Sequence, residues 1–294
     1  MNAGTGSVAP PGRSLWSDAW VVLRRNRAAM TALCLLGGMT VLVLVGPLLS
    51  PFTYDGTDWD QISSPPSLAN GHWFGTDGLG RDLFVRTLYG GRISLLVGAV
   101  ATAVSLLIGI SYGAVAGYVG GRTDQVMMRI VDILYALPFM FLVILLMVLF
   151  GRHIVLIFFA IGAINWLDMA RIVRGQALSL RGKEYVDAAR AAGVRGGRII
   201  RRHIVPNLLG VVIVYATLTV PQVILVESFL SFLGLGVQEP MTSWGALVNE
   251  GAQELENAPW MLLFPAVSLA LTLFCFNFVG DGLRDALDPR DRSA

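Results

Sequence analysis

The amino-acid sequence predicts an all-α membrane protein with six transmembrane helices. Of its 294 residues, 54% are hydrophobic and only 14% are charged, whereas about a quarter of the residues in a typical soluble domain are charged. Several uncharged runs reach the length of about 20 residues that a helix needs to cross a bilayer. No run alternates polar and apolar residues as the strands of a membrane barrel do, so the spans are expected to be helices.

The predicted spans are the long apolar runs, of which the fourth and fifth each contain one acidic residue. They cover residues 28–49, 93–118, 133–150, 154 to about 169, 208 to about 235, and 260–279. Residues 1–27 are expected to form a tail followed by a short amphipathic helix at the membrane surface. Residues 50–92 form a predicted polar loop, residues 93–283 a core of five helices, and residues 284–294 a second tail.

Arginine placement predicts the orientation, because the inside loops of membrane proteins are enriched in arginine and lysine. Both termini and the basic segment 171–207 are expected on the cytoplasmic side, and the loops 50–92 and 236–259 outside. Three arginines in the first outer loop go against this rule, and they are expected to lie near acidic residues. They are Arg81, Arg86 and Arg92.

Charge and cysteine content exclude several other classes of protein. A formal net charge of +2 gives no indication of a polyanionic partner. Cys34 and Cys275 both lie in apolar runs, which indicates neither a disulfide framework nor a metal site. No acid/base pair or metal cluster typical of a membrane enzyme is present in the sequence pattern.

The most informative segment is the basic one at residues 171–207. Small or aromatic side chains recur there at helical spacing and would give a short helix one smooth face. They are Tyr185, Ala188, Ala189 and Ala192. Gly193 is expected to end this helix as its C′ residue. A second short helix is expected at 198–203, and Pro206 is expected to close the segment because proline disrupts a helix interior.

Two helices joined by a glycine turn, followed by arginines, also fit a DNA-binding helix-turn-helix. The context excludes that function, because membrane spans hold the segment at both ends and would keep it out of a major groove. Inside-positive charge explains the arginines but not the alanine face. We therefore expect no nucleic acid partner, and expect the face to dock into the groove of another protein.

The segment resembles the EAA loop of bacterial ABC-importer permeases. The matching residues are Asp187-Ala188-Ala189, then Gly193, then Pro206. Asp187 stands where the family has glutamate, and the family's usual isoleucine and leucine near the end of the loop are replaced by His203 and Val205.

Motifs elsewhere in the chain extend the resemblance over nearly its whole length. Residues 75–82 (GTDGLGRD), 117–121 (GYVGG) and 280–289 (GDGLRDALDP) resemble the peptide/nickel permease subfamily. Residues 12–16 (GRSLW), 57–59 (TDW) and 166–176 (WLDMARIVRGQ) are similar to the C-type permeases of oligopeptide importers.

The resemblance implies the type I ABC importer permease fold in the bacterial inner (plasma) membrane. It implies a related B-type permease as partner, two ATP-binding subunits, an external peptide-binding protein and an oligopeptide substrate. ATP and magnesium would be bound by the partner subunits, with no cofactor in this chain, and the sequence agrees because Gly182-Lys183 is followed by Glu184 rather than by the serine or threonine of a phosphate-binding loop. The residues implied to couple to the ATPases are Glu184, Tyr185, Asp187, Ala188, Ala189, Ala192, Gly193 and Pro206.

Glu227 and Pro221 in the fifth span are candidates for the pathway or its external gate. A carboxylate in hydrocarbon is costly and normally faces the bundle interior or water. A solvated helix end, or an arginine partner, would also account for Glu227. Proline is common in membrane helices, so a simple kink is the other explanation of Pro221.

Two further features have competing explanations. The second span carries a stripe of small residues, which packs either within this subunit or against the partner permease. The stripe consists of Gly109, Gly113 and Gly117. Asp168 and Asn165 near the end of the fourth span are expected to interact with Arg171 or Arg174 rather than with substrate.

Other transport functions remain as alternatives. A dipeptide or nickel permease would share the same fold and motifs. A secondary transporter would need no ATPases, but it predicts inverted repeats and ion-binding carboxylates at the bilayer midplane. The spans contain only Asp168 and Glu227, both away from the centre of their spans.

Overall fold

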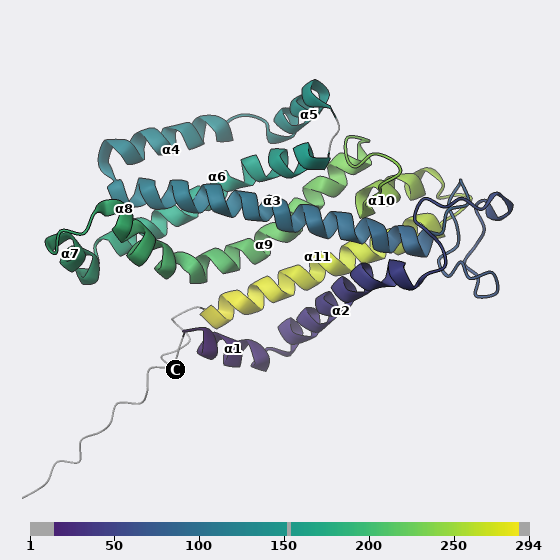
Figure 1. The fold of residues 1–294 in the computed structure, drawn as a ribbon, viewed down its shortest axis with the longest axis horizontal. Coiled ribbons are helices and arrows are strands. Elements are labelled where there is room, and N and C mark those ends of the chain that lie inside the picture. Colours follow the sequence, from purple (N-terminus) through teal and green to yellow (C-terminus); the bar gives the residue numbers. More distant parts are fainter. Residues whose placement is uncertain (1–14, 152–153, 288–294) are drawn as a thin grey trace, which may run out of the picture.

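A computed structural model describes residues 15–151 and 154–287 of the chain, and these residues are mostly helical (Figure 1). In chain order the helices are α1 (Leu15–Arg25), α2 (Arg27–Leu49), a 3₁₀ turn (Trp59–Gln61), α3 (Leu83–Val119), α4 (Gly121–Tyr135), α5 (Phe139–Phe150), α6 (Ile154–Arg181), α7 (Glu184–Ala191), α8 (Gly196–Ile199), a π-helical turn (Ile200–Ile204), α9 (Val205–Phe232), α10 (Trp244–Gln253) and α11 (Trp260–Leu287). The only β structure in the described ranges is two isolated bridges within the loop between α2 and α3.

Four helices in the described part of the chain are long and apolar enough to cross a membrane. They are Arg27–Leu49, Leu83–Val119, Gly196–Phe232 and Trp260–Leu287. The bent pair α4 and α5 would make a fifth span, and the predicted fourth span forms the first part of α6, which is not among these candidates. The all-α membrane architecture is therefore confirmed, and the number of six spans stays a prediction.

Several predicted spans differ in extent from the helices that form, since α6 and α11 continue to Arg181 and Leu287, and the second and third spans differ most. The second begins at Leu83 rather than at residue 93, because Asp82 caps the helix with its side chain and the charges of Arg86 and Arg92 find partners. The predicted span 133–150 is broken near its start: α4 ends at Tyr135, α5 begins at Phe139, and the two helices meet at an angle of 77°. Pro138 lies at the break, where its missing N–H and its ring interrupt the helical hydrogen bonds.

The helices run nearly side by side, with α7 and α8 at one end of the molecule and α10 and the loop 50–82 at the other (Figure 1). Helix α3 packs against α6 along the glycine stripe. A Cβ added at Gly109 would lie 2.6 Å from the Met169 Cβ, and one at Gly117 would lie 2.6 Å from the Arg174 carbonyl oxygen. The stripe therefore packs within this subunit, since only glycine permits so close an approach of the two backbones.

Helix α1 lies beside the last turns of α11. Its Ala19 and Leu23 are buried in a cluster with Ala29 and Ala286. The predicted amphipathic helix thus forms, and its apolar side is covered at least in part by the protein itself rather than by lipid alone.

Candidate functional site

The predicted docking helix forms as α7. Glu184 and Asp187 lie in its first turn and Arg190 in its last, so the charges oppose the partial charges of the helix ends. Lys183 occupies the N-cap position without a side-chain hydrogen bond to the helix. A helix of this length is marginal by itself, so packing must hold it in place.

Gly193 ends α7 as predicted, with φ at +76°. Its N–H donates to the Arg190 carbonyl oxygen at 2.9 Å, and the Val194 N–H donates to the Ala189 carbonyl oxygen at 3.0 Å. These two bonds are a Schellman motif, in which a left-handed residue closes the helix. The prediction that Gly193 is the C′ residue of this helix is confirmed.

Val186 is the residue that holds α7 against the bundle, and its role was not predicted. Its side chain is completely buried in a cluster of apolar residues from α3, α6, α8 and α9. Members of this cluster include Ala114, Val173, Ala177, Ile199 and Leu208. Val186 is the only large aliphatic residue of α7, which is the signal that could have identified it.

The predicted docking face is largely free in this chain. Tyr185, Ala188 and Ala192 are exposed, whereas Ala189 is half-buried and packs against the same cluster as Val186. Glu184 and Asp187 are also exposed. The structure therefore brings three of the four face residues together on the surface, and their docking to an ATPase remains a prediction.

Arg190 ties α7 to α3. Its guanidinium lies over the Tyr118 ring, 5.1 Å from the ring centroid, and Nε donates to the Tyr118 hydroxyl at 3.5 Å. Nη1 donates to Asp187 at 3.0 Å. The hydrogen bond with Tyr118, together with the nearby Asp187 charge, raises the pKa of Arg190 above its ordinary value.

Pro206 does not close the segment, so that expectation is wrong. Gly196–Phe232 is continuous through α8, a π-helical turn and α9, with Pro206 in the first turn of α9. The preceding π turn, in which Val205 N–H bonds the Ile200 carbonyl oxygen, widens the backbone locally. Proline is tolerated there because the backbone hydrogen bonds change from π-helical to α-helical spacing at the first turn of α9.

Two ion pairs link α4 to α6 at the start of the basic segment 171–207. Arg174 binds Asp124 in a bidentate manner, with Nε and Nη2 at 2.7 and 2.6 Å from the two carboxylate oxygens. These hydrogen bonds raise the pKa of Arg174. Arg171 pairs with Asp132 at 2.8 Å.

Asp168 and Asn165 do not bind the arginines, contrary to expectation. Asp168 accepts a hydrogen bond from the Tyr135 hydroxyl at 3.1 Å. Asn165 donates to the Ile161 carbonyl oxygen at 2.9 Å. Arg171 and Arg174 prefer the carboxylates of α4, which face them across the helix pair.

Glu227 is neither solvated nor paired with an arginine. Its side chain has no exposed surface, and it accepts hydrogen bonds from Ser94 at 3.1 Å and from Ser231 at 2.7 Å. Ser231 in turn accepts from Ser243, the N-cap of α10, and Ser94 accepts from the Trp244 N–H. We call Ser94, Ser231 and Ser243 the serine cradle; it joins α3, α9 and α10 through one carboxyl group.

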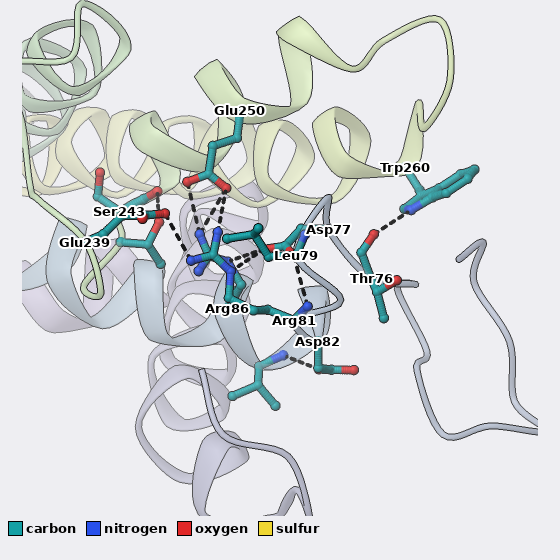
Figure 2. Close-up of polar contacts among 12 residues, drawn as sticks. Thr76, Asp77, Leu79, Arg81, Asp82, Arg86, Glu239, Ser243, Glu250 and Trp260 are labelled. Carbon is teal, nitrogen blue, oxygen red and sulfur yellow. Dashed lines mark hydrogen bonds and ion pairs between the residues drawn. The ribbon is translucent and has the colours of Figure 1, made fainter. Parts of the chain in front are cut away.

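Two of the three arginines that were expected near acidic residues, Arg81 and Arg86, pair with them (Figure 2). Arg86 is completely buried and binds both oxygens of Glu250 from α10, at 3.0 and 2.9 Å. Arg81 binds Asp77 at 2.6 Å and Glu239 at 3.0 Å. Burial opposes the charge of Arg81, but these carboxylates outweigh it and raise the pKa of Arg81.

Arg92 finds a different kind of partner. Its guanidinium donates to the carbonyl oxygens of Val43, at 2.8 Å, and Leu44 near the end of α2. These contacts fasten α3 to α2 and α10, and they explain how three arginines are accommodated at the end of the molecule opposite to the basic segment.

Two family descriptions match the chain. Residues 109–293 match the family described as "Binding-protein-dependent transport system inner membrane component". Residues 14–66 match the "N-terminal TM domain of oligopeptide transport permease C".

Curated proteins are similar over nearly the full length. The oligopeptide transport system permease protein OppC of Haemophilus influenzae is 60% identical over 281 residues, covering 96% of this chain and 90% of the relative. The protein of the same name from Escherichia coli K12 is 59% identical, with coverage of 96% and 93%. The dipeptide transport system permease protein DppC of Bacillus subtilis is 49% identical over 287 residues, with coverage of 97% and 89%. The chain therefore belongs to the family of binding-protein-dependent transport system inner membrane components.

Proposed function

We propose that this chain is the C-type permease of an ABC importer for oligopeptides. The observation that carries this proposal is the identity of about 60% with oligopeptide permeases over 96% of the chain. The chain itself would perform no chemistry. It would form half of the pathway, and a related B-type permease would form the other half.

The proposed coupling site is α7 with the turn that follows it. Tyr185, Ala188 and Ala192 present an exposed surface of small side chains around one aromatic ring, which suits insertion into a groove of an ATP-binding subunit. Two such subunits would bind ATP and magnesium. Because Val186 fixes α7 to α3, α6 and α9, movement of the docked helix would displace the bundle as a rigid body.

The proposed topology has six spans in the bacterial inner membrane, with both termini in the cytoplasm. Helix α6 supplies the sixth span in this arrangement. An external binding protein would deliver peptide at the end that holds α10. We further propose that Glu227 and Pro221 belong to the external gate, since the serine cradle is the point where α10 is held to α3 and α9.

Co-purification and uptake measured together test the function. The tagged chain, expressed with its operon, should retain a second permease and ATP-binding subunits. Proteoliposomes of the complex should take up a pentapeptide only when ATP is supplied on the side of the ATP-binding subunits and the binding protein on the opposite side. Recovery of the chain alone, or peptide uptake that needs no nucleotide, would contradict the proposal.

Dipeptide uptake is the second candidate. The specific observation in its favour is that the Bacillus subtilis dipeptide permease is 49% identical to this chain, and the oligopeptide permease of the same organism 46%. Competition between a labelled dipeptide and an unlabelled pentapeptide in the same proteoliposomes separates the two substrates.

A further inference from the structure

A small cavity lies where α4 bends into α5 and faces α6. Its volume is about 250 Å³, below the range of about 300–1,000 Å³ usual for sites that hold a whole drug-sized ligand. The lining is mostly apolar, with polar groups from three residues. They are Tyr135, Asn165 and Asp168.

The carboxylate of this cavity, Asp168, forms no ion pair with a described residue. One of its oxygens accepts from Tyr135. The nearest arginine along α6, Arg171, forms its ion pair with Asp132 and lies over the Tyr135 ring, 4.4 Å from the ring centroid. Asn165 has its amide NH₂ committed to the Ile161 carbonyl oxygen, and its amide oxygen remains as an acceptor.

The exposed carboxylate of Asp168 faces the cavity and is open to a ligand. Asp168 is exposed and lies at the end of a predicted membrane span, where a charged side chain is costly unless it faces water, a cavity or a counter-charge. A lipid tail offers none of these. The cavity therefore fits a ligand that carries a positive charge on a short chain.

We propose that this cavity is a transient subsite of the transport pathway that receives the α-ammonium group of the peptide, with Asp168 as the counter-charge and the Asn165 amide oxygen as a second acceptor. The inference rests on the proposed function. The site holds one end of the peptide and leaves the side chains outside, so it selects for a free amino terminus and not for sequence.

The Tyr135 hydroxyl gives this site its geometry. By donating to one carboxylate oxygen it fixes the rotamer of Asp168 and leaves the second oxygen for the ligand. Because α4 and α5 meet at the cavity, a change in their angle of 77° would alter the distance between the two sides of the site. A subsite that opens and closes in this way would release the peptide as the bundle moves.

The experiment uses the assembled importer in nanodiscs, with a reporter thiol on the cavity wall. Cys34→Ser and Cys275→Ser remove the native thiols, and Ala163→Cys adds one at an exposed lining position. The rate of alkylation by a membrane-impermeant maleimide is measured against rising concentrations of trialanine or of N-acetyl-trialanine.

The free peptide is expected to halve the alkylation rate at a concentration about fivefold lower than the acetylated peptide, as expected for one partly exposed ion pair. Asp168→Asn should remove the difference. The control Glu256→Gln, which neutralises an exposed carboxylate outside the cavity lining, should keep it.

The inference would be overturned if the two peptides slowed alkylation equally, or if neither slowed it. It would also be overturned if the difference between the peptides survived Asp168→Asn. A thiol that reacts with a membrane-permeant maleimide but not with the impermeant one would place the cavity against lipid and also overturn it. Uptake by the same complex in proteoliposomes keeps the proposals apart: no ATP-dependent uptake of any peptide refutes the importer, whereas normal uptake without selective protection refutes only the subsite.

Discussion

The Val194 N–H donates a hydrogen bond of 3.0 Å to the Ala189 carbonyl oxygen, across a left-handed residue at Gly193. This bond turns the chain back toward the bundle at the point where α7 ends. It therefore fixes the direction in which the exposed face of α7 points, and the turn is the first place where we expect a substitution to affect coupling.

Gly193→Ala should destabilise the turn by about 1 kcal/mol, because a residue with a Cβ is disfavoured at positive φ. Nothing lies within 4 Å of the added Cβ, so backbone strain would be the whole effect. The thermal unfolding temperature of the purified complex and the amount of peptide transported per ATP should both fall. Gly197→Ala is the matched control, since that glycine is helical and equally open; a loss of the same size there would exclude the turn as the cause.

Ala188→Arg should prevent binding of the ATP-binding subunits, because a long charged side chain cannot enter a groove shaped for alanine. Membrane insertion should be normal, since Ala188 is exposed in this chain. Pull-down of the ATPases with the tagged permease measures the effect. Ala191→Arg places the same side chain at an exposed position of α7 outside the predicted face, and equal loss of ATPases in both variants would contradict the docking face.

Val186→Ala should loosen α7 without altering its outer surface. Truncation of a completely buried side chain costs about 1–3 kcal/mol when neighbours do not collapse into the space. The ATPases should still bind and hydrolyse ATP, while the amount of peptide transported per ATP falls. A wild-type amount of peptide transported per ATP would show that α7 does not need the buried Val186 side chain for coupling.

Glu227→Gln should preserve folding, because an amide can still exchange hydrogen bonds with the serine cradle. Glu227→Ala should cost about 2–4 kcal/mol, since it leaves a cavity and unpaired hydroxyls. If Glu227 belongs to the external gate, the glutamine variant should change peptide uptake or basal ATPase activity at unchanged thermal stability. A glutamine variant with wild-type uptake and ATPase activity would rule out a gating role.

The sequence allowed prediction of features that depend on local pattern. Long uncharged runs predicted α2, most of α3, most of α9 and α11, and the placement of Gly193 predicted the end of α7. These features follow from hydropathy and backbone preference over neighbouring residues, and no knowledge of distant contacts is needed.

Other features depend on partners far apart in the chain. The helix start at Leu83 was hidden by Arg86, whose partner Glu250 lies more than 160 positions away. The environment of Glu227 depends on Ser94 and Ser243 from two other helices. Spacing within one segment does not reveal such contacts.

The unbroken helix from Gly196 to Phe232 has a consequence for the size of the movements within a transport cycle. Ile199 and Glu227 are separated by roughly 40 Å along it, at a rise of about 1.5 Å per residue. If the inner end pivots by about 10°, the outer end sweeps about 7 Å. Because the serine cradle joins α3 to α9 beside Glu227, a rigid-body movement would carry these contacts with it, so a small tilt at the nucleotide side would become a larger displacement at the opposite end of the bundle.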